Sequence, residues 1–210
     1  MLTVIFDLDN CLAPSDEAGP DLLDPVFAAV RRANKGRLSE EELEAAFAEC
    51  WVRAFDAVAE KHGFSKEMRD AGWEAFSRVE VQVPLRGYGD LDVLPHIGDR
   101  RFLVTSGFRR LQESKVRALG IAEVFDEVVI DALDEPGRRG KERVFADLLE
   151  SHGLDGAEVL VVGDDPGSEL ASARKLGIRA VQILRPRIEP ASSVPQVRNL
   201  AELRAHITGQ

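Results

Sequence analysis

The chain has 210 residues, of which 44% are hydrophobic and 30% are charged, and its formal net charge at pH 7 is −10. This length suits one large domain or one domain with an insert, and the composition is that of a soluble globular protein. The acidic charge makes nucleic acid and anionic membranes poor candidate partners, because like charges repel. It also means that any anionic substrate must be attracted locally, by a metal or by placed basic residues.

The first predicted element is an apolar, largely β-branched run at residues 2–6, which indicates a buried parallel strand. Asp7 and Asp9 follow it directly. Burying two carboxylates so close together is costly unless another group offsets their charge. A divalent cation would do so, and it would leave one carboxylate free to attack an electrophile and the other free to move protons.

Residues 12–21 are rich in Pro, Gly, Ser and Asp and are expected to form a loop, and the chain from 24 to about 80 is expected to be helical. Three helices are predicted there: one from Asp24 to about Lys35, a long one opened by the capping box of Ser39 and Glu42 and ending at His62, and one from Ser65 to about Val79.

Four apolar side chains recur at three- or four-residue spacing along the long predicted helix, namely Phe47, Trp51, Phe55 and Val58. Helical periodicity favours the hydrophobic core of a helical unit. A platform on which a base or a sugar stacks is the second interpretation of the same stripe.

From residue 85 onward, predicted strands and helices alternate. Strands are expected at 101–105, 124–130, 158–162 and 179–184, and helices at 89–97, 108–119, 141–152, 167–176 and 198–207. This alternation predicts βαβ units, hence an α/β fold with a doubly wound parallel sheet and a helical insert after its first strand. Right-handed crossovers bring all carboxyl ends of the strands to one edge, where ligands bind.

Four motifs lie at or near that edge, and their order is informative. They are residues 4–11, with Asp7 and Asp9; residues 102–107, a strand ending in Thr105, Ser106 and Gly107; residues 140–145, with Lys141 at a helix start; and Gly163–Asp164, with Glu169 as the final acidic position. In type, order and setting they resemble the haloacid dehalogenase superfamily, specifically its phosphatase branch with a C1-type helical cap. The resemblance covers nearly the whole chain and implies a Rossmann-like core.

The carboxylates carry the chemistry that this resemblance implies. Asp7 is the candidate nucleophile, which would attack phosphorus to give an aspartyl-phosphate. Mg²⁺ between Asp7, Asp164 and a phosphate oxygen would reduce the charge repulsion, with the backbone carbonyl of Asp9 as a further ligand. The Asp9 carboxyl group is the candidate acid and base. Because halide departure needs no proton, a carboxylate at Asp9 favours phosphoryl transfer over dehalogenation.

The phosphate itself would be held by Thr105 and by the backbone N–H groups of Ser106 and Gly107. Each of these residues could also be a plain strand-to-helix connection. Lys141 would bring a positive charge to the phosphoryl group. The segment before it departs from the family pattern, and three arginines could take its place, namely Arg138, Arg139 and Arg143.

The remaining positions of the metal loop leave alternatives open. Asp165 either binds the metal through water or only shapes the loop. Glu169 stands where Asp is commoner, and it could face the lysine instead of the metal. Cys11 stands where Thr or Val occurs in the family, and neither cysteine has the arginine six residues later that a cysteine phosphatase requires.

The resemblance also implies a division into two domains, a core of residues 1–13 and 84–210 and a cap of residues 14–83. Hinges are expected at 13–14 and 84–89, so that the cap can close and exclude water. The family's phosphonatases use a cap lysine as a Schiff base, and three lysines keep that option open, namely Lys35, Lys61 and Lys66.

The function predicted from the sequence is a Mg²⁺-dependent phosphatase for a small phosphorylated metabolite, such as a sugar phosphate, phosphoglycolate or a nucleoside monophosphate. The alternatives are a phosphomutase or phosphonatase, a non-catalytic phosphate-binding or regulatory protein, and a receiver-like domain. With two cysteines and no signal-peptide pattern, the expected location is the cytoplasm. The oligomeric state stays open.

Overall fold

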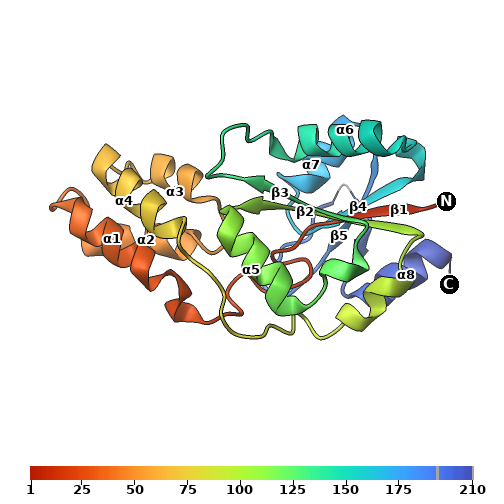
Figure 1. Cartoon of the computed structure of the whole chain (residues 1–210), viewed down its shortest axis with the longest axis horizontal. Helices are drawn as coiled ribbons and strands as arrows, with labels where there is room; N and C mark the ends of the chain where they lie inside the picture. Colours follow the sequence, from red (N-terminus) through yellow and green to blue (C-terminus); the bar gives the residue numbers. More distant parts are fainter. Residues whose placement is uncertain (193, 210) are drawn as a thin grey trace.

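The computed structural model describes residues 1–192 and 194–209, and a six-stranded parallel sheet lies at its centre (Figure 1). The strand order is β3-β2-β1-β4-β5-β6. The strands are β1 (Thr3–Phe6), β2 (Arg100–Gly107), β3 (Glu127–Ala132), β4 (Val159–Gly163), β5 (Arg179–Ile183) and β6 (Gln196–Val197). The predicted fold class is therefore confirmed. Only β6 was not expected, because two residues carry no periodic pattern.

Helices cover both faces of the sheet. They are α5 (Arg109–Leu119), α6 (Gly140–His152), α7 (Glu169–Lys175) and α8 (Leu200–Thr208), with a 3₁₀ turn, η2 (Leu91–His96). Figure 1 shows α6 and α7 on one face and α5 and α8 on the other. One hydrophobic cluster, including Phe102 and Phe145, fills the first face, and another, including Phe6 and Leu203, fills the second. Both faces of the sheet are buried, which explains the continuous apolar runs of β1 and β4.

The register of the central strand determines which loops meet. Phe6, the last residue of β1, is aligned with Leu103 of β2 on one side and with Val162 of β4 on the other. Because the strands are parallel, the chain leaves β1, β2 and β4 at one edge of the sheet. This edge is the topological switch point, where the chain turns from one half of the sheet to the other.

Four helices and a 3₁₀ turn lie between β1 and η2, and they extend beyond the carboxyl edge of the sheet (Figure 1). They are η1 (Pro20–Leu23), α1 (Asp24–Asn34), α2 (Glu40–Glu49), α3 (Phe55–Lys61) and α4 (Lys66–Phe76). The capping box predicted at Ser39 and Glu42 is confirmed, since each side chain accepts a hydrogen bond from the other residue's backbone N–H.

The long helix predicted from Ser39 to His62 is wrong, because it is broken between α2 and α3. The break lets Phe55 pack edge-on against Phe64 and tilted against Phe76, with ring centroids 6.2 and 5.5 Å away. Gly72 of α4 leaves the space for this ring, since a Cβ there would lie 2.2 Å from Phe55 Cζ. Burial of one aromatic ring thus overrides local helical preference.

The apolar stripe of the insert nevertheless forms part of a hydrophobic core, as predicted. Phe47, Phe55 and Val58 are buried in one hydrophobic cluster, and Trp51 packs against it half-buried. The same cluster contains Phe108, which follows β2 and stacks on Phe76 of α4 with ring centroids 4.7 Å apart. The helical insert and the β2–α5 connection therefore share one apolar interface.

The chain crosses between the insert and the sheet domain twice, and Glu17 holds the two crossings together. Its carboxylate accepts hydrogen bonds from the backbone N–H groups of Arg86 and Gly87 at 2.7 to 3.1 Å. Gly87 has φ +63°, and a Cβ there would lie 2.5 Å from the carbonyl oxygen of Leu12. The close approach of the two segments therefore requires glycine.

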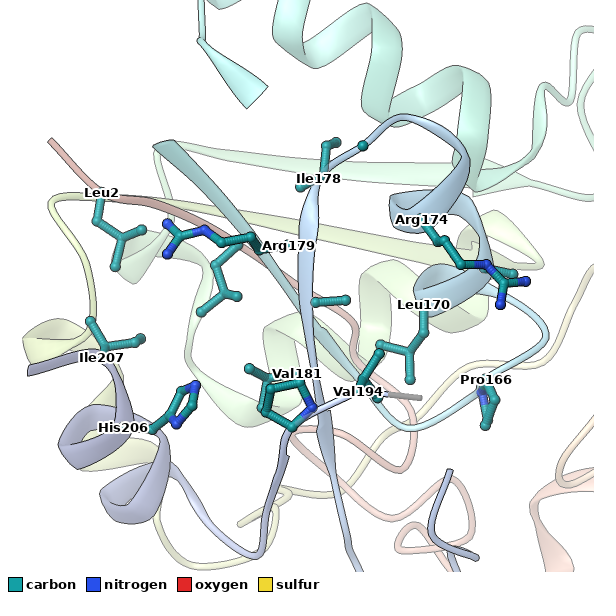
Figure 2. A pocket seen from close by; sticks show the side chains of 15 residues that line it. Leu2, Pro166, Leu170, Arg174, Ile178, Arg179, Val181, Val194, His206 and Ile207 are labelled. Carbon is teal, nitrogen blue, oxygen red and sulfur yellow. The ribbon is translucent and has the colours of Figure 1, made fainter. Parts of the chain in front are cut away.

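A cavity of about 710 Å³ lies beside the amino half of β5, between α7 and α8 (Figure 2). Its lining is mainly apolar, with Leu170, Ile178 and Val181 among the side chains shown. None of the predicted site residues lines it. Among the helices of residues 1–192 and 194–209, none is both long enough and apolar enough to cross a bilayer.

Candidate active site

Asp7 lies at the carboxyl end of the central strand, where the buried run of β1 stops. Its backbone N–H continues the parallel ladder by donating to the carbonyl of Val162 at 3.0 Å. The residue is only 7% exposed. The strand therefore holds this carboxylate rigidly in a largely dry position, which is the setting expected of a reactive group.

Lys141 contacts Asp7 from the first turn of α6. Its Nζ donates to Asp7 Oδ1 at 2.7 Å and to Glu169 Oε2 at 2.8 Å. Glu169 is 1% exposed, and its second oxygen accepts the backbone N–H of Asp165 at 2.7 Å. Both oxygens of Glu169 are thus engaged by the lysine and the loop, which matches the interpretation that this glutamate faces the lysine.

The three arginines considered as substitutes for Lys141 pair with other carboxylates. Arg139 and Arg143 both contact Asp147, at 2.6 and 2.8 Å. Arg138 pairs with Asp56 of the insert. Lys141 is accordingly the cation that the structure brings to Asp7 from this segment.

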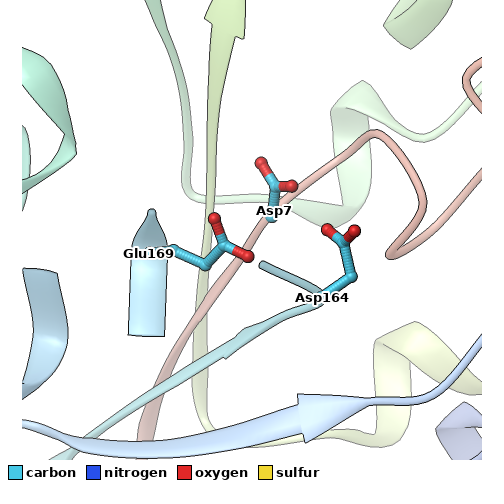
Figure 3. A group of neighbouring side chains, drawn as sticks. All are labelled: Asp7, Asp164 and Glu169. Carbon is cyan, nitrogen blue, oxygen red and sulfur yellow. The ribbon is translucent and has the colours of Figure 1, made fainter. Parts of the chain in front are cut away.

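Three carboxylates converge at the edge of the sheet, as Figure 3 shows. Asp7 comes from the end of β1, Asp164 from the residue after β4, and Glu169 from the start of α7. One oxygen of each lies within 4.8 Å of the others. Carboxylate oxygens are the donors that Mg²⁺ prefers, and Asp7 and Asp164 could supply them while Glu169 holds Lys141.

Burial changes how these groups bind protons. Loss of hydration, together with the neighbouring carboxylates, outweighs Lys141 and raises the pKa of Asp7 to about 7. The same causes raise the pKa of Asp164 to about 8. Burial alone would lower the pKa of Lys141, but the charges of Asp7 and Glu169 overcome it and raise that pKa. A divalent cation would relieve this excess of buried negative charge, so the donor set fits Mg²⁺ electrostatically as well.

Gly163, the last residue of β4, makes the position of Glu169 possible. A Cβ at residue 163 would lie 2.3 Å from Glu169 Oε1. Any larger residue at position 163 would push the Glu169 carboxylate away from the end of β4. This close approach explains why glycine is needed before Asp164.

Asp131, which the sequence analysis did not consider, positions the start of α6. It is 3% exposed at the end of β3, and its two oxygens accept the backbone N–H groups of Arg139 and Gly140 at 2.9 and 3.1 Å. These are N–H groups that a helix start leaves without helical partners. Asp131 thereby fixes the turn that aims Lys141 at Asp7.

The carboxylate of Asp9 is held by α5. Lys115 Nζ lies 2.6 Å from Asp9 Oδ1, and Gln112 Nε2 donates to Asp9 Oδ2 at 2.9 Å. Asn10, with φ +57°, turns the chain immediately after Asp9. Lys115 and Gln112 were not predicted from the sequence, because polar residues within a helix are normally solvated and only the packing of α5 buries these two.

The three residues predicted to hold phosphate lie at the end of β2. Thr105 is 1% exposed, and Ser106 and Gly107 are half-buried. The requirement for glycine at 107 comes from Gln112, because a Cβ there would lie 2.4 Å from Gln112 Nε2. In the loop after β4, the Asp165 carboxylate accepts a hydrogen bond from the backbone N–H of Gly167 at 2.7 Å.

Cys11 is fully buried, with Sγ 3.7 Å from the carbonyl oxygen of Val162. Burial and the nearby carboxylates raise the pKa of its thiol well above the ordinary value. Burial therefore disfavours the thiolate form that a cysteine nucleophile needs.

A second cavity, of about 540 Å³, opens between the insert and the loop after β5. Its lining includes Phe47 and Trp51 of the stripe, Arg31 of α1, and Arg187. Arg187 also pairs with Asp16 at 2.9 Å, across the boundary between the insert and the sheet domain.

Comparison with known sequences identifies a family for this arrangement. Residues 1–177 match the family described as haloacid dehalogenase-like hydrolase. A phosphoserine phosphatase of Thermus thermophilus is 31% identical over 158 residues, which are 72% of this chain and 62% of that protein. The chain thus matches less than two thirds of that relative's length.

Two further similarities extend over more of the chain. A glyceraldehyde 3-phosphate phosphatase of Methanopyrus kandleri is 27% identical over 199 residues, covering 87% of this chain and 83% of that protein. The crystal structure of a HAD phosphatase from Thermococcus onnurineus superposes with a TM-score of 0.67 at 23% identity, covering 100% of this chain and 99% of that one. This structural likeness supports the fold.

Proposed function

Because the chain belongs to the haloacid dehalogenase-like hydrolases, we propose that it is a Mg²⁺-dependent phosphatase that acts on a small phosphorylated metabolite. The observation that carries this proposal is the position of Asp7. Its buried carboxylate lies at the switch point of the sheet, 2.7 Å from Lys141 and among the acidic oxygens that suit Mg²⁺.

Mg²⁺ would be held by side-chain oxygens of Asp7 and Asp164 and by the backbone carbonyl of Asp9. When bound, it would supply positive charge that reduces the repulsion between a carboxylate and a phosphate dianion. Glu169 would support the site through Lys141, because its oxygens already accept hydrogen bonds from Lys141 and from the backbone of Asp165.

Catalysis would proceed in two displacements at phosphorus. An oxygen of Asp7 attacks phosphorus, the bond to the leaving oxygen breaks, and protonated Asp9 gives that oxygen its proton. Asp9 then takes a proton from water, the water oxygen attacks phosphorus, and the bond to Asp7 breaks to release phosphate. Proton transfer of this kind contributes about 10²–10⁴ in rate.

The phosphoryl oxygens would be bound by Lys141, by the hydroxyl group of Thr105, and by the backbone N–H groups of Ser106 and Gly107. A lysine ammonium beside Asp7 serves both states of the reaction, because it offsets the charge of the free carboxylate and of the phosphoryl group bound to it.

Residues 14–83 would act as a C1-type cap over a core of residues 1–13 and 84–210. The cap lies beyond the edge of the sheet that carries Asp7, so its closure would exclude water. The two relatives are phosphatases named for phosphoserine and glyceraldehyde 3-phosphate, and these small metabolites support a substrate of that class.

Hydrolysis of p-nitrophenyl phosphate, followed with and without Mg²⁺, tests the proposal. We expect turnover with Mg²⁺, loss of that turnover in Asp7→Asn, and a slowing of at least about 10² in Asp9→Asn for an alkyl phosphate. Wild-type protein that binds phosphate without turning over any phosphate ester would instead indicate a regulatory protein.

A further inference from the structure

A buried cation next to the candidate acid and base is not explained by the mechanism above. The Lys115 side chain is 7% exposed on α5, and a lysine is seldom buried without a partner. Within the described residues, its ion-pair partner is Asp9, with Nζ 2.6 Å from Oδ1. The site therefore contains two buried lysines: Lys141 reaches the candidate nucleophile, and Lys115 reaches Asp9.

Gln112 lies three residues before Lys115, and this spacing places both side chains on the same face of α5. Its Nε2 donates to Asp9 Oδ2 at 2.9 Å, so each carboxylate oxygen of Asp9 has its own partner from one helix. Gln112 is 4% exposed, and its Oε1 has no hydrogen-bond partner among the described residues. Leaving a buried amide oxygen unpaired is unfavourable. The Gln112 side chain nevertheless takes this position, in which its Nε2 binds Asp9, and this indicates that the hydrogen bond to Asp9 is important.

The backbone also accommodates this contact. Gly107 ends β2, and a Cβ there would lie 2.4 Å from Gln112 Nε2. Glycine thus lets the amide pass the end of the strand and reach the β1 loop. The β2–α5 segment and the loop after β1, which are about 100 residues apart in sequence, therefore meet at the Asp9 carboxylate.

From this geometry, and resting on the proposed phosphatase function, we propose that Lys115 and Gln112 are positioning residues for Asp9. They transfer no proton themselves. They restrict the side-chain rotation of Asp9, so that its carboxyl group is already aligned when it gives a proton to the leaving oxygen. Misplacement of a catalytic group by about 1 Å can cost about 10² in rate.

The test compares two substrates that differ only in the leaving group. Phenyl phosphate releases a poor leaving group that needs the proton of Asp9, whereas 2,4-dinitrophenyl phosphate releases a stable phenolate that does not. We expect Lys115→Met to lower kcat for phenyl phosphate by at least about tenfold, with less than about threefold loss for the dinitrophenyl ester. Lys115→Arg, which keeps a cation at this position, should recover part of the loss.

A double-variant comparison separates positioning from general damage. If Lys115 acts through Asp9, Lys115→Met combined with Asp9→Asn will be no slower on phenyl phosphate than Asp9→Asn alone. Gln112→Leu gives the same comparison without removing a charge, should Lys115→Met fold poorly. Arg110→Met is the matched control, because Arg110 is also on α5 but is exposed and pairs with Glu80.

Equal losses for the two esters, or additive losses in the double variant, would overturn the positioning role. The result is also distinguishable from a failure of the proposed function. Wild-type protein inactive on both esters with Mg²⁺ refutes the phosphatase, whereas an active wild type and an unimpaired Lys115→Met refute only the role of Lys115.

Discussion

Asp7 and Asp164 make the stability of the protein depend on pH in an unusual direction. Their pKa values rise on folding from 3.8 to about 7 and about 8. Between pH 4 and these values the native state binds protons that the unfolded state releases, so the free energy of unfolding falls as pH rises. In EDTA, we expect stability to drop by up to about 4 kcal/mol from pH 6 to pH 8.5.

Urea denaturation at the two pH values measures this change. Asp164→Asn should reduce the drop, because it removes the group with the higher of the two raised pKa values. Saturating Mg²⁺ should reduce it as well, because the cation favours the ionised carboxylates. Stability that is equal or higher at pH 8.5 in EDTA would contradict the raised pKa values.

How far single residues could be predicted depended on where they lie along a strand. Asp7 and Asp164 were found from sequence because each interrupts an apolar run at its end. Lys115 was not found, because a lysine within a helix is normally solvated and only the packing of α5 buries it. Asp131 was missed for a similar reason, since its partners are backbone N–H groups eight and nine residues later.

At the scale of elements, the start of α6 connects stability with the site. The Asp131 carboxylate accepts hydrogen bonds from two backbone N–H groups at this helix start, and Lys141 lies in the first turn that follows. We expect Asp131→Ala to cost about 1–2 kcal/mol in stability, the usual cost of losing a helix cap. It should also lower kcat, because Lys141 is no longer fixed beside Asp7.

Asn199→Ala is the control for this prediction. Asn199 caps α8 by accepting the backbone N–H of Glu202 at 2.8 Å, and α8 packs on the side of η2 and β6, away from Lys141. Urea denaturation should show a comparable loss of stability in both variants, and steady-state kinetics should show a fall in kcat for Asp131→Ala alone. A parallel fall in both variants would mean that Asp131 acts only on stability.

The prediction of helices and strands was wrong where tertiary packing overrides the local hydrophobic periodicity. The regular alternation after residue 85 was predictable because each strand is a buried run and each helix is amphipathic. The break between α2 and α3 was not, because Phe55 fits the helical stripe by spacing but is buried against Phe64 and Phe76 by the return of α4.

Over the whole molecule, the insert and the sheet domain are joined by an apolar contact and by hydrogen bonds. Phe108 stacks on α4, while Glu17 binds the backbone of residues 86 and 87. Topology could be predicted from the order of the elements, but these contacts depend on side chains that approach across the boundary between the two parts. Phe108 directly follows Ser106 and Gly107, whose backbone would bind phosphate. Its contact with α4 would therefore couple movement of the cap to the phosphate-binding end of β2.

The convergence of remote carboxylates on one cation is the claim on which the whole account depends. Isothermal titration calorimetry of Mg²⁺ into the protein, with and without inorganic phosphate, measures it directly. We expect one Mg²⁺ per chain, affinity weakened at least about tenfold in Asp164→Asn, and no change in Asp70→Asn, an exposed carboxylate of α4. Absence of Mg²⁺ binding by the wild type, or unchanged affinity in Asp164→Asn, would contradict the account.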